Sequence, residues 1–307
     1  MAQERELPGW HSCREMGEIL AAEGFAPQYY RGAEFTAPLR GAVVDSREAG
    51  PGLLFAARRG EARDGHDFLV PAYKNGCRHF LVSQDYPCQN YANLCAEATF
   101  MAVKGSPEAA LFAWARRYRR NLKSVYVLAV SGSYGKTSTK ELLGKILAQR
   151  YLCYVTPGNR NAPVGCALSI LAIPPETEIA VLELGIDHPG EMDLLCSLAQ
   201  PNAALLTGIG SAHLGRFRSQ EHLAYEKARI YAHLQSPSAA RNKQALAFVP
   251  EDDRFLPILR SQVGHLPDSP FAGRGTKGGL KEILYSAERA KRQGYLVEDR
   301  GLEGLHF

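Results

Sequence analysis

The second part of the chain alternates short apolar runs with longer amphipathic stretches. Continuous apolar runs at 125–130, 179–184 and 203–207 have the character of strands buried on both faces of a parallel sheet. A fourth strand is expected near 153–155, after a helix predicted over 137–150. Because each run is followed by a turn and a stretch suited to a helix, the pattern predicts a doubly wound, mostly parallel α/β sheet.

The first hundred residues predict a smaller α/β unit. Short apolar runs at 41–45, 53–57 and 79–83 suit three strands that are separated by turn-forming residues. Residues 68–75 suit one short helix, which would end at Gly76.

A third helix, predicted over 107–122, carries a cluster of basic residues. Ser106 suits the N-cap and Pro107 the first helical position. The basic residues are Arg116, Arg117, Arg119, Arg120 and Lys123. Such a cluster either binds phosphate or nucleic acid or forms a solvated face. The apolar stripe opposite it favours the solvated face, so no nucleic-acid partner is expected.

Length and charge define the broad class of protein. A chain of 307 residues is long enough for two domains. We expect an N-terminal domain over 1–105, a linker helix over 106–123 and a central domain over 124–307. Lys plus Arg number 36 and Asp plus Glu 32, so the net charge of +4 is too small for a dedicated polyanion binder.

The compartment follows from what the composition excludes. No apolar stretch approaches the roughly 18 residues of a membrane span, and the N-terminus is too charged for a signal peptide. The seven cysteines are odd in number and form no C-x-x-C pair, which favours reduced thiols. We therefore expect a cytoplasmic chain.

A glycine-rich loop, SGSYGKT at 131–137, lies between a predicted strand and a predicted helix. In this context glycines let backbone N–H groups approach phosphates, Lys136 would neutralise their charge and the Thr137 hydroxyl would hold Mg²⁺. The strict phosphate-loop pattern is not met because residue 130 is valine, so a coincidental turn is the alternative. The flanks favour an ATP site. Its expected residues are Ser131, Gly132, Ser133, Tyr134, Gly135, Lys136, Thr137 and Ser138.

Two further residues lie where a metal site would need them. Glu183 falls at the end of one buried strand and His213 just beyond the next. Because the carboxyl ends of parallel strands share one edge, both would face the same crevice as Lys136. There they could hold Mg²⁺ ions between ATP and an acceptor. Alternatively, Glu183 pairs with an arginine and His213 caps a helix, and the sequence leaves this open.

Several short motifs, in order along the chain, together resemble the Mur ligases, the ATP-dependent enzymes that build the peptidoglycan stem peptide. The resemblance covers residues from about 40 to about 255. The motifs are DSR at 45–47, PGLLFA at 51–56, DGHDF at 64–68, SGSYGKTSTKE at 131–141, TPGNRN at 156–161, ELG at 183–185, GEM at 190–192, AHL at 212–214 and the stretch 219–227 that ends in EK.

The resemblance implies roles for individual residues. Lys136, Glu183, His213 and Lys227 match the catalytic set, in which Thr137, Glu183, His213 and a carbamylated Lys227 hold two Mg²⁺ ions. The alternative interpretation of Lys227 is a solvent-facing helical lysine, and the sequence leaves this open. Substrate binding is implied for Ser46, Arg47, Asp64, Gly65 and His66 at the UDP end, and for Asn159 and Asn161 near the phosphate and acceptor.

The activity implied is amide-bond formation driven by ATP through an acyl phosphate. The resemblance is greatest to the member that joins D-Ala-D-Ala to UDP-N-acetylmuramoyl-tripeptide, on the motifs at 139–141 and 158–161. The alternatives are the sister ligase that adds the third stem residue and a module that binds UDP-muramoyl-peptide and ATP without ligating them. A folate polyglutamylating enzyme is disfavoured by the N-terminal motifs. A monomer is expected.

Three departures from the family pattern stand out. Ala129 and Gly208 replace a glycine and an asparagine that these ligases usually carry. The third departure is at the C-terminus, where the family has a domain that closes over ATP, so we expect a central domain truncated by residue 307. A mobile loop is expected over 266–279 and strand-like runs over 294–297 and 305–307.

Overall fold

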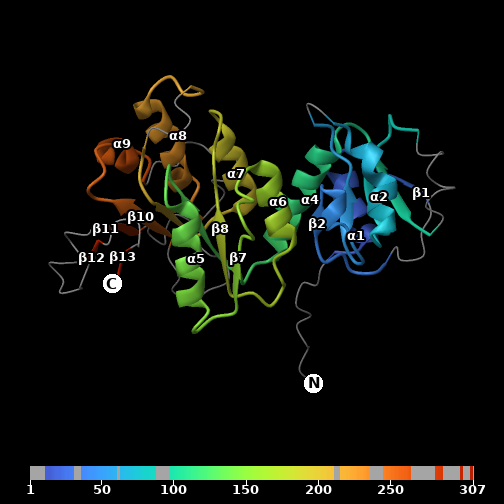
Figure 1. Ribbon diagram of the computed structural model, residues 1–307, viewed down its shortest axis with the longest axis horizontal. Coiled ribbons are helices and arrows are strands. Elements are labelled where there is room, and N and C mark those ends of the chain that lie inside the picture. Colours follow the sequence, from blue (N-terminus) through green and yellow to red (C-terminus); the bar gives the residue numbers. More distant parts are fainter. Residues whose placement is uncertain are drawn as a thin grey trace. The chain divides into compact units, whose positions relative to one another are not determined.

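The computed structural model describes residues 11–30, 36–60, 63–87, 97–210, 215–235, 245–263 and 281–285, together with two short strands near the C-terminus. The chain forms two compact units (Figure 1). Unit 1 comprises Met1–Val125 and Pro163–Glu178, and unit 2 comprises Tyr126–Ala162 and Ile179–Phe307. The helix predicted as a linker belongs to unit 1, and so do residues 163–178, which fall within the central domain predicted from the sequence.

Unit 1 is built on a five-stranded sheet in the order β1-β5-β4-β3-β2, in which β1 runs antiparallel to β5 and the other neighbours are parallel. The strands are β1 (Gln28–Tyr30), β2 (Ala42–Val43), β3 (Leu54–Ala56), β4 (His79–Ser83) and β5 (Thr99–Val103). The helical segments are α1 (Cys13–Ala22), η1 (Ser46–Glu48), η2 (Gly65–Phe68), α2 (Leu69–Lys74), α4 (Pro107–Asn121) and α6 (Pro163–Leu171). The three strands and the short helix predicted here are confirmed, whereas β1 and β5 were missed.

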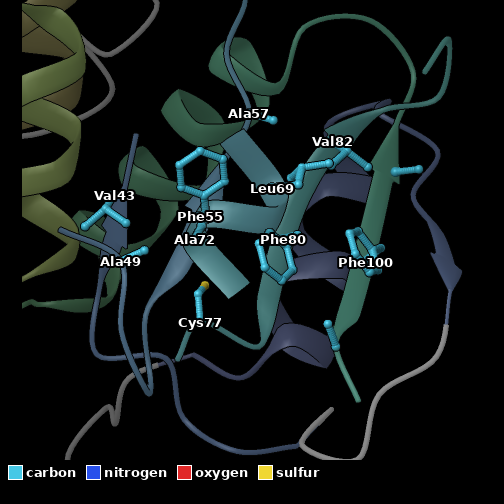
Figure 2. Packing of buried hydrophobic residues seen from close by; sticks show 12 residues of the cluster. Val43, Ala49, Phe55, Ala57, Leu69, Ala72, Cys77, Phe80, Val82 and Phe100 are labelled. Atoms are coloured by element: carbon cyan, nitrogen blue, oxygen red, sulfur yellow. The ribbon is translucent and has the colours of Figure 1, made fainter. Parts of the chain in front are cut away.

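The core of unit 1 contains aromatic rings contributed by neighbouring strands (Figure 2). Phe55, Phe80 and Phe100 come from β3, β4 and β5, and the rings of Phe80 and Phe100 stack with their centroids 4.9 Å apart. Phe55 meets Phe80 edge-on at 6.2 Å. Every residue of β4 and β5 is buried, and apart from His79, Ser83 and Thr99 at the strand ends these residues are apolar.

Helix α4 begins as the sequence predicts and then corrects one expectation. The Ser106 hydroxyl accepts hydrogen bonds from the first helical N–H groups, behind Pro107. The basic face is not uniformly solvated, because Arg119 is buried and donates to the carbonyl of Leu122. The opposite side of α4 packs against α6, and the Tyr118 hydroxyl donates to the carbonyl of Ile173 just beyond that helix.

Unit 2 is a six-stranded, fully parallel sheet in the order β11-β10-β9-β6-β8-β7. The strands are β6 (Tyr126–Ser131), β7 (Cys153–Val155), β8 (Ile179–Glu183), β9 (Ala203–Leu206), β10 (Leu246–Pro250) and β11 (Lys281–Tyr285). The helices are α5 (Lys136–Leu147), α7 (Glu191–Ala199), α8 (Gln220–Ala232) and α9 (Leu256–Ser261). With β6 at the centre and the chain winding to both sides, the predicted doubly wound α/β class is confirmed.

The C-terminal segments are only partly described. Strands β12 (Glu298–Asp299) and β13 (Leu305–His306) pair antiparallel. The loop expected over 266–279 and the strand expected over 294–297 lie outside the described residues. Within the described ranges, no helix combines the length and the apolar character that crossing a bilayer requires.

Candidate functional site

The glycine-rich loop joins the central strand β6 to the first turn of α5. Gly135 sits at the N-cap in the left-handed region with φ 69°, and no side chain caps the helix, so its first N–H groups remain available for an anion. Gly132 has φ 142°, and a Cβ there would lie 2.0 Å from the Thr207 hydroxyl. The Lys136 ammonium folds back onto the carbonyl of Gly132 at 3.1 Å.

The end of the neighbouring strand β9 holds this loop in place. The Ser133 N–H donates to the carbonyl of Gly208 at 2.9 Å, and the Thr207 N–H donates to that of Ser131 at 2.8 Å. The Thr207 hydroxyl also donates to the carbonyl of Tyr134. Thr207 was not among the predicted site residues. Its place directly after a buried strand was the available signal, because β9 neighbours β6 in the sheet.

Tyr134 lies across two glycines and is 61% exposed. A Cβ on Gly208 would be 2.4 Å from the Tyr134 hydroxyl, and one on Gly210 would be 3.3 Å from the ring. The phenol therefore occupies the volume into which a side chain at position 208 would project. The absence of an asparagine there is matched by the presence of a large residue on the loop.

Glu183 collects the polar contacts at the end of β8, where its side chain is 1% exposed. The Thr137 hydroxyl donates to its Oε2 at 3.0 Å, and the Asn161 amide donates to its Oε1 at 2.8 Å. The fold thus brings together three of the predicted site residues. The cation beside the carboxylate is Lys140, at 3.6 Å, and not the arginine of the alternative interpretation.

Lys140, which was not among the predicted site residues, lies beside Glu183. Its side chain is fully buried, and its ammonium donates to the carbonyls of Thr156 at 2.8 Å and Gly158 at 2.6 Å. The signal was its spacing, because a residue four positions after Lys136 lies on the same helix face.

Lys227 on α8 approaches the phosphate loop from the other side. Its ammonium is buried and donates at 3.1 Å to the carbonyl of Gly132, which also accepts from Lys136. The pKa of Lys227 is lowered to about 7, mainly by burial and also by the nearby Lys136, while Asp187 acts in the opposite direction. The solvent-facing alternative for Lys227 is therefore wrong.

The remaining predicted residues of unit 2 have varied positions. Ser131 and Ser133 have buried hydroxyl oxygens without a hydrogen-bond partner in the described structure. Ser138 and Asn159 are exposed, and the carbonyl of Asn159 accepts from the Asn161 N–H at 2.7 Å. His213 lies outside the described residues.

Ser46 and Arg47, which were expected to bind the UDP end, lie on the short helix η1 of unit 1. Ser46 is buried and its carbonyl accepts from the Asn75 amide at 2.8 Å. Arg47 is exposed and pairs with Asp45. This hydrogen-bonded pair lowers the pKa of Asp45 to about 2. Of the two, only Arg47 presents its side chain to solvent.

The loop formed by Asp64, Gly65 and His66 is stabilised by contacts of the buried His66 ring. His66 is fully buried; its Nε2 accepts from the Ser83 N–H at 3.0 Å and its Nδ1 contacts the Asp64 carboxylate. Its ring also stacks on Tyr86 with centroids 4.2 Å apart. A Cβ on Gly65 would lie 2.6 Å from a backbone oxygen. In this arrangement the His66 ring supports the loop and presents no free nitrogen to a ligand.

These features together define a class of protein. The glycine-rich loop follows the central parallel strand, a lysine and a threonine begin the next helix, and a carboxylate lies on the adjacent strand, which is the arrangement of a phosphate-loop nucleotide site. Residues 130–278 match the Mur ligase middle domain, and the chain belongs to the Mur ligase family.

Relatives and solved structures agree with this assignment. The chain is 36% identical over 219 residues to UDP-N-acetylmuramoyl-tripeptide–D-alanyl-D-alanine ligase of Bacillus subtilis, across 71% of this chain and 45% of that protein. The ligase of the same name from Treponema pallidum is 32% identical, across 87% of this chain and 57% of that protein. The chain therefore spans about half the length of the curated relatives that it matches.

Two solved structures share the fold. Crystal structure II of MurF from Acinetobacter baumannii superposes with a TM-score of 0.71 and 27% identity, over 92% of this chain and 54% of that one. MurF ligase from Thermotoga maritima, in complex with ADP, superposes with a TM-score of 0.60 and 31% identity, over 80% of this chain and 50% of that one.

Proposed function

We propose that this chain supplies the nucleotide site of an ATP-dependent amide ligase that adds D-Ala-D-Ala to UDP-N-acetylmuramoyl-tripeptide. The observation that carries the proposal is the buried Glu183 carboxylate, contacted by Thr137 and Asn161 at the edge of the phosphate loop. The names of the relatives supply the substrate class. The same proposal assigns the UDP end of the substrate to unit 1, with Arg47 as its exposed candidate contact.

The residues present suit a magnesium ion that is shared with a nucleotide better than a metal ion held by protein side chains alone. Among the described residues, no group of three or more His, Cys, Asp or Glu side chains could hold a metal. Mg²⁺ is usually held by one or two carboxylates, water and the phosphates of a nucleotide. Thr137 and Glu183 would hold it here. When bound, the ion would offset the charge of the phosphates.

Side chains of this chain would lower the activation barrier of phosphoryl transfer by their charge and by positioning the reactants. The tripeptide carboxylate attacks the γ-phosphorus, ADP leaves, and the amine of D-Ala-D-Ala displaces phosphate from the resulting acyl phosphate. The first step brings two anions together, so cations near the transferred group stabilise it. Lys136 and Lys227 converge on one carbonyl of the loop, and the buried hydroxyls of Ser131 and Ser133 remain available to a phosphate.

The pKa of Lys227 supports carbamylation of this residue. A pKa of about 7 leaves a substantial neutral fraction at neutral pH, whereas an ordinary lysine has little. The neutral amine can attack CO₂ and release a proton, which gives an anionic carbamate with two oxygen donors. We infer that this carbamate would contribute to a second Mg²⁺ site, together with His213.

A ligation assay tests the proposed function directly. The full chain is incubated with UDP-N-acetylmuramoyl-tripeptide, D-Ala-D-Ala, ATP and Mg²⁺, and the product is weighed by mass spectrometry. We expect a mass gain of one dipeptide less water. Lys136→Ala should abolish product formation and nucleotide turnover with the fold retained, because it removes the charge directed at the phosphates.

The matched control is Lys145→Ala, an exposed position on the same helix, which should behave as the unmodified chain. Nucleotide binding without product in the unmodified chain would identify a non-ligating binding module instead. Unchanged turnover in Lys136→Ala would exclude the phosphate-loop assignment.

A further inference from the structure

We propose that Lys140 is a positioning residue of the nucleotide site: its buried ammonium ties the 156–161 loop to Glu183 and sets how that carboxylate meets a bound cation. The inference rests on the proposed function, because the cation is the one that would accompany the nucleotide. Lys140 itself is too deeply buried to contact substrate.

The contacts of Lys140 match the donors of an ammonium group. Lysine has three N–H donors and no acceptor. Two point to the carbonyls of Thr156 and Gly158, at 2.8 and 2.6 Å. Carboxylate oxygens of Glu141, at 3.1 Å, and Glu183, at 3.6 Å, complete the surroundings. The lysine is therefore bound by both the loop and the acidic groups beside it.

The loop in turn contacts Glu183 at both of its ends. At its start, the Thr156 hydroxyl accepts from the Glu183 N–H at 3.1 Å. At its end, the Asn161 amide donates to Glu183 Oε1 at 2.8 Å, and the Asn161 carbonyl accepts from the Gly185 N–H at 2.9 Å. Between these ends, the Gly158 carbonyl is bound by Lys140. Displacing the ammonium would release the middle of a loop that is bonded at one end to the Glu183 backbone and at the other end to its carboxylate.

Packing alone does not call for a lysine at this position. Lys140 shares a helix face with Leu143 and Leu147, which pack against the apolar core of unit 2. A leucine or methionine at 140 would continue that apolar stripe without the cost of burying a charge. The presence of an ammonium therefore follows from its acceptors, all of which belong to the site or its immediate neighbours.

Positioning and simple charge neutralisation predict opposite results. If Lys140 only offsets the charge of Glu183, its removal makes the site more negative, and Mg²⁺ should bind as well or more tightly. If Lys140 orients the loop and the carboxylate, its removal should weaken Mg²⁺–nucleotide binding. Residues that support metal ligands typically contribute about 10–100-fold in metal affinity.

The experiment compares the full chain with Lys140→Met and with Lys145→Met, the same substitution at an exposed position of α5. Binding of a fluorescent ADP analogue is titrated with Mg²⁺ and with EDTA, and hydrogen exchange is followed over 156–161. For Lys140→Met we expect about a tenfold or greater loss of affinity with Mg²⁺, a smaller loss in EDTA and faster exchange of the loop. Lys145→Met should match the unmodified chain in all three measurements.

Two further variants separate the charge of Lys140 from its geometry. Lys140→Arg keeps the charge but not the compact three-donor geometry, so it should not restore affinity. Lys140→Gln keeps an amide donor and should fall between lysine and methionine, which also provides a test if the methionine variant does not fold.

The inference is overturned by undiminished Mg²⁺–nucleotide affinity in Lys140→Met, by full rescue with arginine or by unchanged exchange of the loop. Failure of the unmodified chain to bind any nucleotide would contradict the proposed function instead. In that case hydrogen exchange on the nucleotide-free chain still tests whether Lys140 holds the loop.

Discussion

At the phosphate loop, the absence of a side chain matters as much as the groups that are present. Gly132 and Gly208 both have φ values near 145°, which side chains rarely adopt, and both face a neighbour that would collide with a Cβ. For Gly132 that neighbour is Thr207, a residue that anchors the loop. For Gly208 it is Tyr134, which belongs to the loop itself.

A double-mutant cycle separates backbone strain from steric conflict at Gly208. Gly208→Ala should destabilise the chain through both effects, whereas in Tyr134→Ala the collision has already been removed. We expect the double variant to be more stable than the sum of the single effects, with a coupling of about 0.5–3 kcal/mol. Urea unfolding measures it. Strict additivity would show that Tyr134 does not restrict position 208.

Carbamylation of the Lys227 side chain can be tested directly. If its amine is carbamylated, ¹³C-bicarbonate should give a labelled carbamate signal that Lys227→Ala lacks. Lys227→Ala should also lose ligase activity, with partial recovery when a small carboxylate is added. The exposed Lys145→Ala is the control for both measurements. Full activity in Lys227→Ala, together with no dependence on bicarbonate, would contradict the carbamate.

At the scale of elements, α4 is held to the segment before α1 by a buried imidazole. The Trp114 indole donates to His11 Nδ1 at 3.0 Å, and the Asn121 amide lies 2.9 Å from Nε2. Protonation would place an N–H against the indole donor and leave a charge in a buried position. Burial lowers the pKa of His11 from its ordinary 6.5, Arg117 lowers it too, and Glu15 partly opposes them.

This lowered pKa predicts an acid-sensitive contact in unit 1. Below pH 6.5 the unfolded chain binds a proton at His11 that the native chain resists, so stability falls as the pH drops from 6.5 toward the native pKa. His11→Gln, which cannot titrate, should lose less stability between pH 7.5 and 5. Urea unfolding of both proteins at several pH values checks this. Parallel curves would exclude His11 as the source.

For the molecule as a whole, unit 1 includes a segment that interrupts the sequence of unit 2. The chain leaves unit 1 at Val125, returns to it for 163–178 and leaves again before β8. Within unit 1, α6 buries most of its residues and packs against α4, where Tyr118 donates to Ile173 at 2.7 Å. Unit 1 therefore includes a segment that lies between β7 and β8 of unit 2 in the sequence.

Because residues 163–178 belong to unit 1, we expect fragments with and without them to differ in stability. A fragment of residues 1–125 lacks α6 and should expose the apolar side of α4, so we expect it to unfold at a lower urea concentration. The same fragment with 163–178 joined through a flexible linker is the matched control, and we expect it to unfold cooperatively at a higher urea concentration. Equal stability of the two fragments would show that α6 contributes nothing to unit 1.

The parallel α/β class and the main residues of the proposed nucleotide site could be predicted from local sequence patterns. Continuous apolar runs are local signals of buried strands, and residues that follow such strands share one edge, so Lys136, Thr137 and Glu183 were predicted to meet. These inferences needed no knowledge of contacts between distant segments.

Other features of the chain depend on tertiary contacts and could not be predicted from the local sequence. It buried His66 with both nitrogens engaged, assigned 163–178 to unit 1 and placed Lys140 under a loop 16 to 18 residues further along the chain. A lysine on a helix is ordinarily solvated, and nothing in the local pattern reveals which backbone carbonyls will surround it. That outcome depends on how strands and loops far apart in the sequence come together, because burial of a charge is stable only where its partners are already in place.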